Sequence, residues 1–249
     1  MNTIEYGQGA VNNTIGWGQG AKVGSSFSNL KSIALDGVDD SVNCGNPTSL
    51  QITGALSISA WFKTTGTSTQ MIVGKDAITG SNRSFHFFCD GSSGVMGFLI
   101  FSSGNTFEQV NSTSVVNDGN WHHVLGVNDG TDLKIYVDGA LEGTNASGGG
   151  TIQNGTTDFY IGRIEGLGSL YRSFWNGSID EVAVWNSDQS ANASTIYNSG
   201  VPNDLTSLSP LSWWRCGDGD TAPTLLDNGS ESNNGTMENF TTFSTDVPT

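Results

Sequence analysis

Residues 120–139 hold two runs of alternating apolar and polar residues around a short polar turn, which strongly limits what the chain can fold into. The turn consists of Asn128, Asp129, Gly130 and Thr131. Such spacing predicts an antiparallel β-hairpin with a loop of about four or five residues. In the second run one face carries Leu133, Ile135 and Val137, and the other carries Asp132, Lys134, Tyr136 and Asp138. We therefore expect a sheet with one buried face.

The composition favours many strands joined by tight turns. The 249 residues include 34 Gly, and 13% of all residues are charged, which suits an all-β domain better than a helical one. The formal net charge of -15 at pH 7 argues against binding to nucleic acid or to an anionic membrane, because an acidic surface is repelled by both. We expect no nucleic-acid partner and no insertion into a membrane.

Neither a signal peptide nor a membrane-spanning stretch is visible in the sequence. Residues 1–7 lack a basic stretch followed by an apolar one. The apolar runs are all much shorter than the roughly 20 residues that a spanning helix needs. The three cysteines, Cys44, Cys89 and Cys216, are widely spaced and odd in number, so we expect reduced, buried thiols within strands.

Several short motifs resemble one known family. Residues 121–124 read Trp-His-His-Val, and residues 133–139 follow the pattern L-x-x-Y-V-D-G. Four further segments match, two before these motifs and two after them, and all stand in the family's order. They are residues 35–42, 56–63, 160–162 and 176–182. The chain thus resembles the laminin-G-like and concanavalin A-like lectin/glucanase jelly rolls. The resemblance implies an all-β fold, a two-sheet antiparallel β-sandwich over residues 33–187. It does not fix the function, because such sandwiches include lectins, adhesion modules, spacers and a few enzymes.

The alternation predicts further strands in this region, separated by clusters of Gly, Ser and Asn. They are residues 33–36, 41–44, 55–63, 70–75, 84–89, 95–101, 107–116, 158–162 and 178–185.

Residues 1–32 contain a glycine-rich repeat, because the segment from Tyr6 to Ala10 recurs from Trp17 to Ala21. Such a stretch cannot build a core of its own. We expect either a flexible leader or an anchoring arm whose Tyr6, Ile15 and Trp17 dock into a neighbouring subunit or a larger assembly. The repeat also resembles the openings of structural proteins from tailed-bacteriophage virions.

Two segments follow the sandwich. Residues 188–204 are predicted to form a linker with a short helix. We expect Ser190 to cap this helix and Ile196 and Tyr197 to dock it on the sandwich. Residues 205–249 resemble a segment that usually stands before the first acidic turn in this family. They either add a strand to the same sandwich or begin a second module. We favour the added strand, because Trp213 and Trp214 would be unfavourable to expose.

Aspartates suggest a metal site. Asp36, Asp39 and Asp40 crowd one predicted turn, and Asp180 interrupts an apolar strand face, where an unpaired carboxylate is unfavourable. A calcium ion held by Asp36, Asp39 and Asp180 would supply a partner. The family resemblance also implies one structural calcium that joins the first and last strands. The alternative is that residues 36–40 make Asx-turns and that Asp180 accepts backbone hydrogen bonds.

The glycine-rich loop at residues 166–175 is the candidate ligand site. Tyr171, Phe174 and Trp175 are suited to stack on sugar rings, with Arg172 and Asn176 as polar neighbours. The alternative is that these aromatic residues belong to the core or to an interface.

The sequence gives little support for catalysis. A retaining glucanase of this fold class needs the motif E-x-D-x-x-E on one strand, and this motif is missing from the sequence. Asp180 and Glu181 are adjacent, so we expect them to point to opposite faces of a strand. His122 and His123 also alternate, and His86 stands alone in its strand, so neither a chelating pair nor a catalytic triad is predicted.

The function that we predict from the sequence is that of a non-enzymatic bacteriophage virion protein, of capsid-decoration or fibre type, with a lectin-like sandwich for surface attachment. It would be made in the host cytoplasm without a signal peptide and lie on the virion surface. It would bind other virion proteins and form a homo-oligomer, with a trimer as one option. The alternative is a carbohydrate-binding module that recognises cell-surface glycans. A glycoside hydrolase is a third option, against which the missing motif argues.

Overall fold

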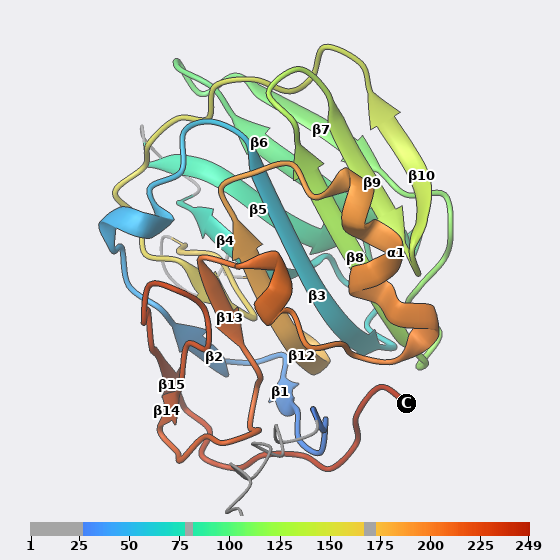
Figure 1. Ribbon diagram of the computed structural model, residues 1–249, viewed down its shortest axis with the longest axis vertical. Coiled ribbons are helices and arrows are strands. Elements are labelled where there is room, and N and C mark those ends of the chain that lie inside the picture. Colours follow the sequence, from blue (N-terminus) through green and yellow to red (C-terminus); the bar gives the residue numbers. More distant parts are fainter. Residues whose placement is uncertain (1–26, 78–81, 167–172) are drawn as a thin grey trace, which may run out of the picture.

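The computed structural model describes residues 27–77, 82–166 and 173–249, and these form a sandwich of two antiparallel sheets (Figure 1). In the described part of the chain, one sheet has seven strands in the order β1-β12-β3-β8-β9-β10, with β13 paired to β12 as a branch. The other has eight strands in the order β14-β15-β2-β11-β4-β5-β6-β7. The predicted all-β fold class is confirmed.

Most strand bounds follow the sequence pattern, but the strand predicted for residues 107–116 ends at Asn111. The seven-stranded sheet contains β1 (Ile33–Asp36), β3 (Leu56–Thr64), β8 (Trp121–Asn128), β9 (Leu133–Val137), β10 (Ala140–Asn145), β12 (Asn176–Trp185) and β13 (Ser212–Trp214). The eight-stranded sheet contains β2 (Ser41–Asn43), β4 (Gln70–Asp76), β5 (Arg83–Cys89), β6 (Met96–Phe101), β7 (Phe107–Asn111), β11 (Tyr160–Ile161), β14 (Thr224–Leu225) and β15 (Gly235–Glu238). Strand β10 was not predicted, because it is an edge strand without buried residues and so lacks an apolar alternation.

The core lies between the two sheets, where alternate residues of each strand point inward. Phe62 of β3 and Phe85 of β5 are fully buried there. The sheets approach closely at Gly126 of β8, where a Cβ atom would lie 2.3 Å from the ring of Phe87 in β5. Each large side chain buried in this way stabilises the fold by about 1.5–3 kcal/mol.

The hairpin that we predicted at residues 120–139 is formed by β8 and β9, with residues 129–132 as its loop. Leu133, Ile135 and Val137 lie in the core. The opposite face is less hydrated than expected, since Tyr136 is 9% exposed. The reason is that residues 186–211 cover the outer face of the seven-stranded sheet and add a second apolar cluster there.

Helix α1 (Ala193–Tyr197) belongs to this cover and lies over β8 and β9 in Figure 1. Ile196 is buried, and the ring of Tyr197 stacks 5.6 Å from that of Trp61, so the predicted docking residues are confirmed. The predicted cap is wrong, because the N-cap residue is Asn192 and Ser190 Oγ has no hydrogen-bond partner. Four 3-10 turns complete the helical elements of the described residues, and they are η1 (Thr48–Leu50), η3 (Ser190–Asn192), η4 (Asn198–Gly200) and η5 (Thr206–Leu208).

The C-terminal segment adds strands to both sheets. Strand β13 pairs with β12, and β15 pairs with β2. Trp214 is fully buried, stacks 5.4 Å from Phe159, and donates from Nε1 to the carbonyl oxygen of Asn233 at 2.8 Å. Figure 1 shows this segment, in orange to red, beside β1 and β2. Residues 205–249 therefore complete the same sandwich.

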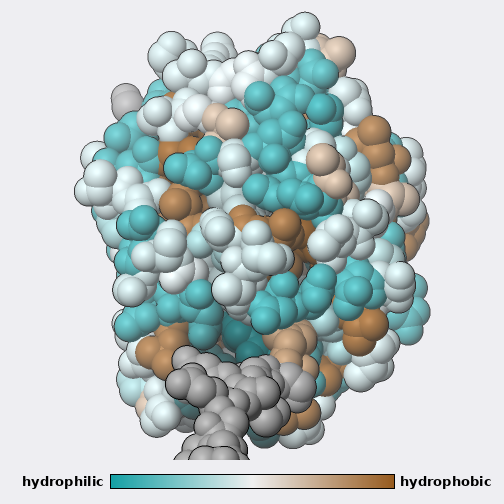
Figure 2. Space-filling view, in the orientation of Figure 1, coloured by the Kyte–Doolittle hydropathy of each residue, from teal (hydrophilic) through white to brown (hydrophobic). Residues whose placement is uncertain are grey.

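The surface in the view of Figure 2 is mixed, with small hydrophobic areas separated by hydrophilic ones. Cys44, Cys89 and Cys216 are free and buried, as predicted, but of the three only Cys89 lies within a strand. In the described ranges, no helix is both long and apolar enough to span a membrane.

Candidate functional site: an acidic turn beside a rim pocket

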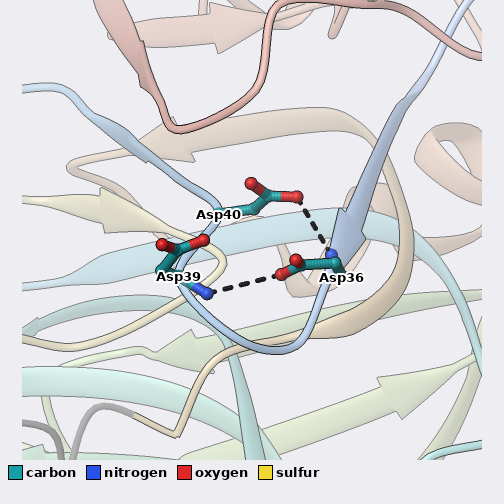
Figure 3. A group of neighbouring side chains, drawn as sticks. All are labelled: Asp36, Asp39 and Asp40. Carbon is teal, nitrogen blue, oxygen red and sulfur yellow. Dashed lines mark hydrogen bonds between the residues drawn. The ribbon is translucent and has the colours of Figure 1, made fainter.

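The connection between β1 and β2 brings three carboxylates together (Figure 3). Their oxygen atoms, from Asp36, Asp39 and Asp40, lie within 4.8 Å of one another. Asp36 Oδ1 accepts hydrogen bonds from the backbone N of Val38 at 2.8 Å and of Asp39 at 3.3 Å. Asp40 Oδ2 accepts from the backbone N of Asp36 at 3.1 Å. The turn is thus an Asx-turn that gathers negative charge.

The electrostatics of this acidic turn suit a cation. Burial raises the pKa of Asp40, and the neighbouring charges of Asp36 and Asp39 raise it further. Oxygen atoms from carboxylates and turn carbonyls are the ligands that calcium prefers. The residues present therefore fit a calcium ion, which Asp36, Asp39 and Asp40 would hold. The ion would neutralise the turn and offer coordination positions to a ligand.

Asp180 does not reach the acidic turn. In the pairing of β1 with β12, Asp36 lies opposite Asn176 and Ile33 opposite Ile179. Asp180 is thus four residues beyond Asn176, which at about 3.3 Å per residue is about 13 Å along the strand. The predicted set of Asp36, Asp39 and Asp180 therefore does not come together, and the carboxylate that lies beside Asp36 and Asp39 is that of Asp40.

The prediction that Asp180 and Glu181 point to opposite faces is also wrong. The pairing of β12 with β3 shifts between Asp180 and Ala183, and Glu181 has a left-handed φ of 48°. This β-bulge inserts a residue and interrupts the alternation. Both carboxyls lie on the outer side of the sheet, where Glu181 Oε2 accepts from Trp213 Nε1 at 2.6 Å.

A rim pocket of about 270 Å³ lies beside the acidic turn. It is lined by residues 65–68 of the β3–β4 loop together with Gly37, Gln70, Phe174 and Asn176. Gly37 joins the turn to the pocket, because a Cβ atom on it would lie 2.7 Å from Asn176 Cβ, and its φ is +78°. Glycine is the residue that allows this approach.

A buried glutamine fixes the floor of the rim pocket. Gln70 is 2% exposed, donates from Nε2 to Thr64 Oγ1 at 2.7 Å, and accepts at Oε1 from the backbone N of Asn176 at 2.8 Å. Thr64 Oγ1 in turn donates to the carbonyl oxygen of Asn176 at 2.7 Å. The backbone of Asn176 is held on both sides, while its side chain is exposed.

The predicted ligand residues separate into three groups. Asn176 and Phe174 line the rim pocket. Trp175 is fully buried and packs edge-on against Phe62 at 5.6 Å, so it is a core residue and the prediction that it stacks on a ligand is wrong. Tyr171 and Arg172 lie outside the described residues, as do the predicted anchors Tyr6, Ile15 and Trp17.

The structure also shows a polar shelf that the sequence analysis missed. It is a hollow of about 460 Å³ on the outer face of the eight-stranded sheet, lined by Asn43, Asp158, Thr236, Glu238 and their neighbours. Asn43 Nδ2 donates to Asp158 Oδ2 at 3.1 Å, and Glu238 Oε2 accepts from Arg163 Nη2 at 3.1 Å. These residues come together by strand pairing between distant segments, for which the sequence carries no local signal.

His122 and His123 point to opposite faces of β8, as predicted. His122 contacts Phe62 on the core side, whereas His123 lies between Trp61 and Tyr197 on the outer side. His86 Nδ1 lies 2.7 Å from Asp76 Oδ2 in a network with Arg83. Burial raises the pKa of Asp76, but the hydrogen bonds from His86 and Arg83 outweigh burial and hold it below its usual value.

Comparison with known families gives the same fold from the sequence. Residues 36–193 match the model of the concanavalin A-like lectin/glucanases superfamily. The chain belongs to this superfamily. The match includes the acidic turn and the rim pocket, whereas β13, β14 and β15 lie beyond it.

Solved structures similar to this superfamily member include two that are named for carbohydrate binding. A candidate carbohydrate-binding protein from Bacteroides ovatus has a TM-score of 0.68 and 18% identity, and the match covers 89% of this chain but 62% of that one. The IT-sialidase CBM40 of Ruminococcus gnavus has a TM-score of 0.55 and 16% identity, over 66% of this chain and 96% of that one. Mouse laminin α1 domains LG4-5 have a TM-score of 0.50 and 16% identity, and the match covers 65% of this chain and 43% of that one. These likenesses show the fold. Among curated proteins, no sequence matches the chain.

Proposed function

We propose that the chain is a carbohydrate-binding module whose rim pocket binds the end of a glycan, with a calcium ion in the adjacent acidic turn. The observation that carries the proposal is the continuity of the two sites through Gly37, which belongs to the turn and lines the pocket. A ligand in the pocket would therefore lie next to the ion. Two of the similar solved structures are named for carbohydrate binding, which supports the proposal.

The lining of the rim pocket suits a neutral sugar. Thr65, Thr67 and Ser68 offer hydroxyls, Asn176 offers an amide, and Phe174 offers an aromatic ring for the apolar face of the sugar. Within the described ranges, no charged side chain lines the pocket. Because the whole chain carries a net charge of -15, we expect neutral glycans to bind better than anionic ones. The volume of about 270 Å³ is near the lower end for ligand pockets and suits one sugar ring.

Binding without hydrolysis is part of the proposal. Glycoside hydrolases place their two carboxyls at most about 9.5 Å apart. On the polar shelf, Glu238 lies opposite Ser41, and Asp158 precedes Tyr160, which lies opposite Asn43. The positions of Asp158 and Glu238 therefore differ by four residues, or about 13 Å along β2. This backbone spacing exceeds the carboxyl separation that either hydrolytic mechanism needs, which supports binding without hydrolysis.

The predicted virion role stays a prediction. It rests on the resemblance carried by the repeat in residues 1–32 and by residues 213–220, and residues 1–26 lie outside the described part of the chain. The same holds for the predicted virion-surface location, the virion partners and the homo-oligomer. Glycan binding is compatible with all of them, since an attachment protein needs a ligand on the host surface.

A glycan array with the full chain tests the proposal, once with calcium and once with a chelator. We expect neutral glycans to bind in calcium and binding to weaken in chelator. Phe174→Ala and Asn176→Ala should each weaken binding about tenfold, which corresponds to about 1.4 kcal/mol. Phe107→Ala and Asn186→Ala are matched controls at exposed positions outside the pocket and should bind like wild type. Silence across a broad array, or equal binding by all four variants, would contradict the proposal.

A further inference from the structure

The first described residues, 27–30, are held on the outer face of the seven-stranded sheet. The ring of Phe27 stacks 6.2 Å from that of Trp213, and the guanidinium of Arg215 lies 4.4 Å from the Phe27 ring centre. Arg215 Nη2 donates to the carbonyl oxygen of Ser28 at 2.6 Å, and the backbone N of Leu30 donates to Asp218 Oδ2 at 2.9 Å. We call residues 27–30 the latch segment.

Asn29 makes the innermost contact of the latch segment. Its Nδ2 donates to Asp180 Oδ2 at 2.8 Å, and the Asp180 side chain is fully buried. On the same planar amide, Asn29 Oδ1 is buried and has no hydrogen-bond partner among the residues that the structure describes. A buried acceptor without a donor is unfavourable by about 1–3 kcal/mol. Asn29 Oδ1 thus lacks a hydrogen-bond donor at a place beside Asp180.

The negative charges around Asp180 favour the protonated form of its carboxyl group. The carboxyl groups of Glu181 and Asp218 both act on Asp180. Asp220 adds a further negative charge near the buried, neutral thiol of Cys216. Arg215 faces them as a cation, with Nε 3.1 Å from Glu181 Oε1 and Nη2 3.3 Å from Asp218 Oδ2.

Lys31 follows the latch segment and packs its Cβ close to Gly217. Among the described residues, no ion pair joins Lys31 to these carboxyls. Three ionised carboxyls around one guanidinium would therefore bury excess negative charge, which is strongly unfavourable.

We propose that Asp180 is held as a neutral carboxylic acid that donates its proton to Asn29 Oδ1, so that acid and amide form a cyclic pair that fastens the latch segment to the sandwich. In this pair Asp180 Oδ2 accepts from Asn29 Nδ2 and the protonated Oδ1 donates to Asn29 Oδ1, so both polar atoms of the Asn29 amide have a partner, while Asp180 Oδ1 also accepts from the backbone N of Glu181 at 2.9 Å. An ionised Asp180 leaves Asn29 Oδ1 unpaired and adds a charge beside Glu181. Burial, followed by the charge of Glu181, also raises the pKa of Asp180 well above its usual value.

The cyclic pair makes the latch segment sensitive to pH. The closed segment binds a proton that the open one releases, since Asp180 regains an ordinary pKa near 4 when it is hydrated. The closed form is therefore most stable at acid pH and loses stability as the pH rises towards the raised pKa. In that window the open fraction increases about tenfold per pH unit. A rise in pH would therefore free residues 27–30 from the outer face of the sheet.

Amide hydrogen exchange of the full chain, measured between about pH 5 and pH 8 and corrected for intrinsic exchange rates, tests this inference on residues 28–32. In wild type we expect protection to fall about tenfold per pH unit. In Asp180→Asn the side chain has no titratable proton, so protection should stay nearly constant with pH, at a lower level than in wild type because the amide nitrogen cannot accept from the backbone N of Glu181. Asn29→Ala should expose the segment at every pH. Asp158→Asn, a substitution on the other sheet, should keep the wild-type dependence.

Infrared spectroscopy gives a second readout that does not depend on segment opening. Burial raises the pKa of Glu181 to about 7, so both proteins contain some carboxylic acid at neutral pH, and the difference spectrum of wild type minus Asp180→Asn should contain the carboxylic-acid carbonyl band of Asp180. Constant protection in wild type, a wild-type slope in Asp180→Asn, or absence of the band would overturn the inference. The latch segment shares no residue with the rim pocket, so these results do not bear on the proposed glycan binding.

Discussion

His122 Nδ1 lies 2.8 Å from Asp138 Oδ2, and Asp138 Oδ1 accepts from the backbone N of His123 at the same distance. Asp138 follows β9 with a left-handed φ of 48°, directly before Gly139. One carboxylate thus clamps the start of β8 to the end of β9. His122 Nε2 also lies 3.2 Å from Asp118 Oδ1, and the imidazole can donate to both carboxylates when it is charged.

The stability of the fold should depend on the charge of His122. The hydrogen bond with Asp138 raises the pKa of His122, although burial opposes the shift. Its stabilisation is therefore complete below the unfolded pKa of about 6.5 and is lost as the pH rises through the folded value. We expect His122→Gln to reduce the free energy of unfolding by about 1 kcal/mol near pH 6 and by less near pH 9. Urea unfolding measures both values, and an equal loss at both pH values would contradict this account.

Lys75 should be essential to the fold although it is charged. It is 1% exposed, and Nζ donates to Asn46 Oδ1 and to the carbonyl oxygens of Gly155 and Thr157, each at 2.7 Å. Lys75→Met leaves three acceptors without a donor and should destabilise the protein by about 2–4 kcal/mol. Lys134→Met is the matched control at a more exposed ion pair and should change stability by less than about 1 kcal/mol. Similar losses in the two variants, measured by thermal unfolding, would show that the buried contacts of Lys75 add little.

Trp175 should matter for stability and not for ligand contact. It is fully buried in the core, so Trp175→Ala should reduce the free energy of unfolding by about 3–5 kcal/mol. Trp175→Phe keeps most of the apolar volume and should bind glycans like wild type. A folded Trp175→Phe protein that has lost glycan binding would restore the sequence-based interpretation of this residue.

The C-terminal segment should be required for folding of the superfamily-matched region. Trp214→Ala removes the stacking on Phe159 and should reduce the free energy of unfolding by about 3–5 kcal/mol. A chain that ends at residue 204 also loses β15, the partner of β2. We expect this shorter chain to show no cooperative urea transition by circular dichroism. A two-state transition close to that of the full chain would contradict the assignment of one sandwich.

Most of the strands could be predicted from the sequence, because a half-buried sheet requires strict alternation. The β8–β9 hairpin and the long strand β3 are examples, since their apolar residues recur at every second position. Strand β10 lacked this signal because it is exposed at the sheet edge. The pairing of β15 with β2 joins residues almost 200 positions apart, and loop composition carries no information about such a partner.

The candidate site was predicted in part, for reasons that are local. The aspartates of the acidic turn lie within five residues of sequence, so their meeting follows from the turn itself. Trp175 is buried in the core, whereas its neighbour Phe174 lines the rim pocket. Which of the two side chains points inward depends on where the loop passes into the alternation of the following strand, and composition does not determine this position. The bulge at Asp180 and Glu181 interrupts the period of two on which the prediction relied.

The central claim is that the rim pocket is the place where a glycan binds. A crystal structure of the full chain with calcium and the strongest glycan from the array tests it most directly. We predict a sugar ring against Phe174 and Asn176, beside an ion held by the acidic turn. A sugar bound on the polar shelf by Asn43 and Glu238, with the rim pocket free of ligand, would contradict the claim.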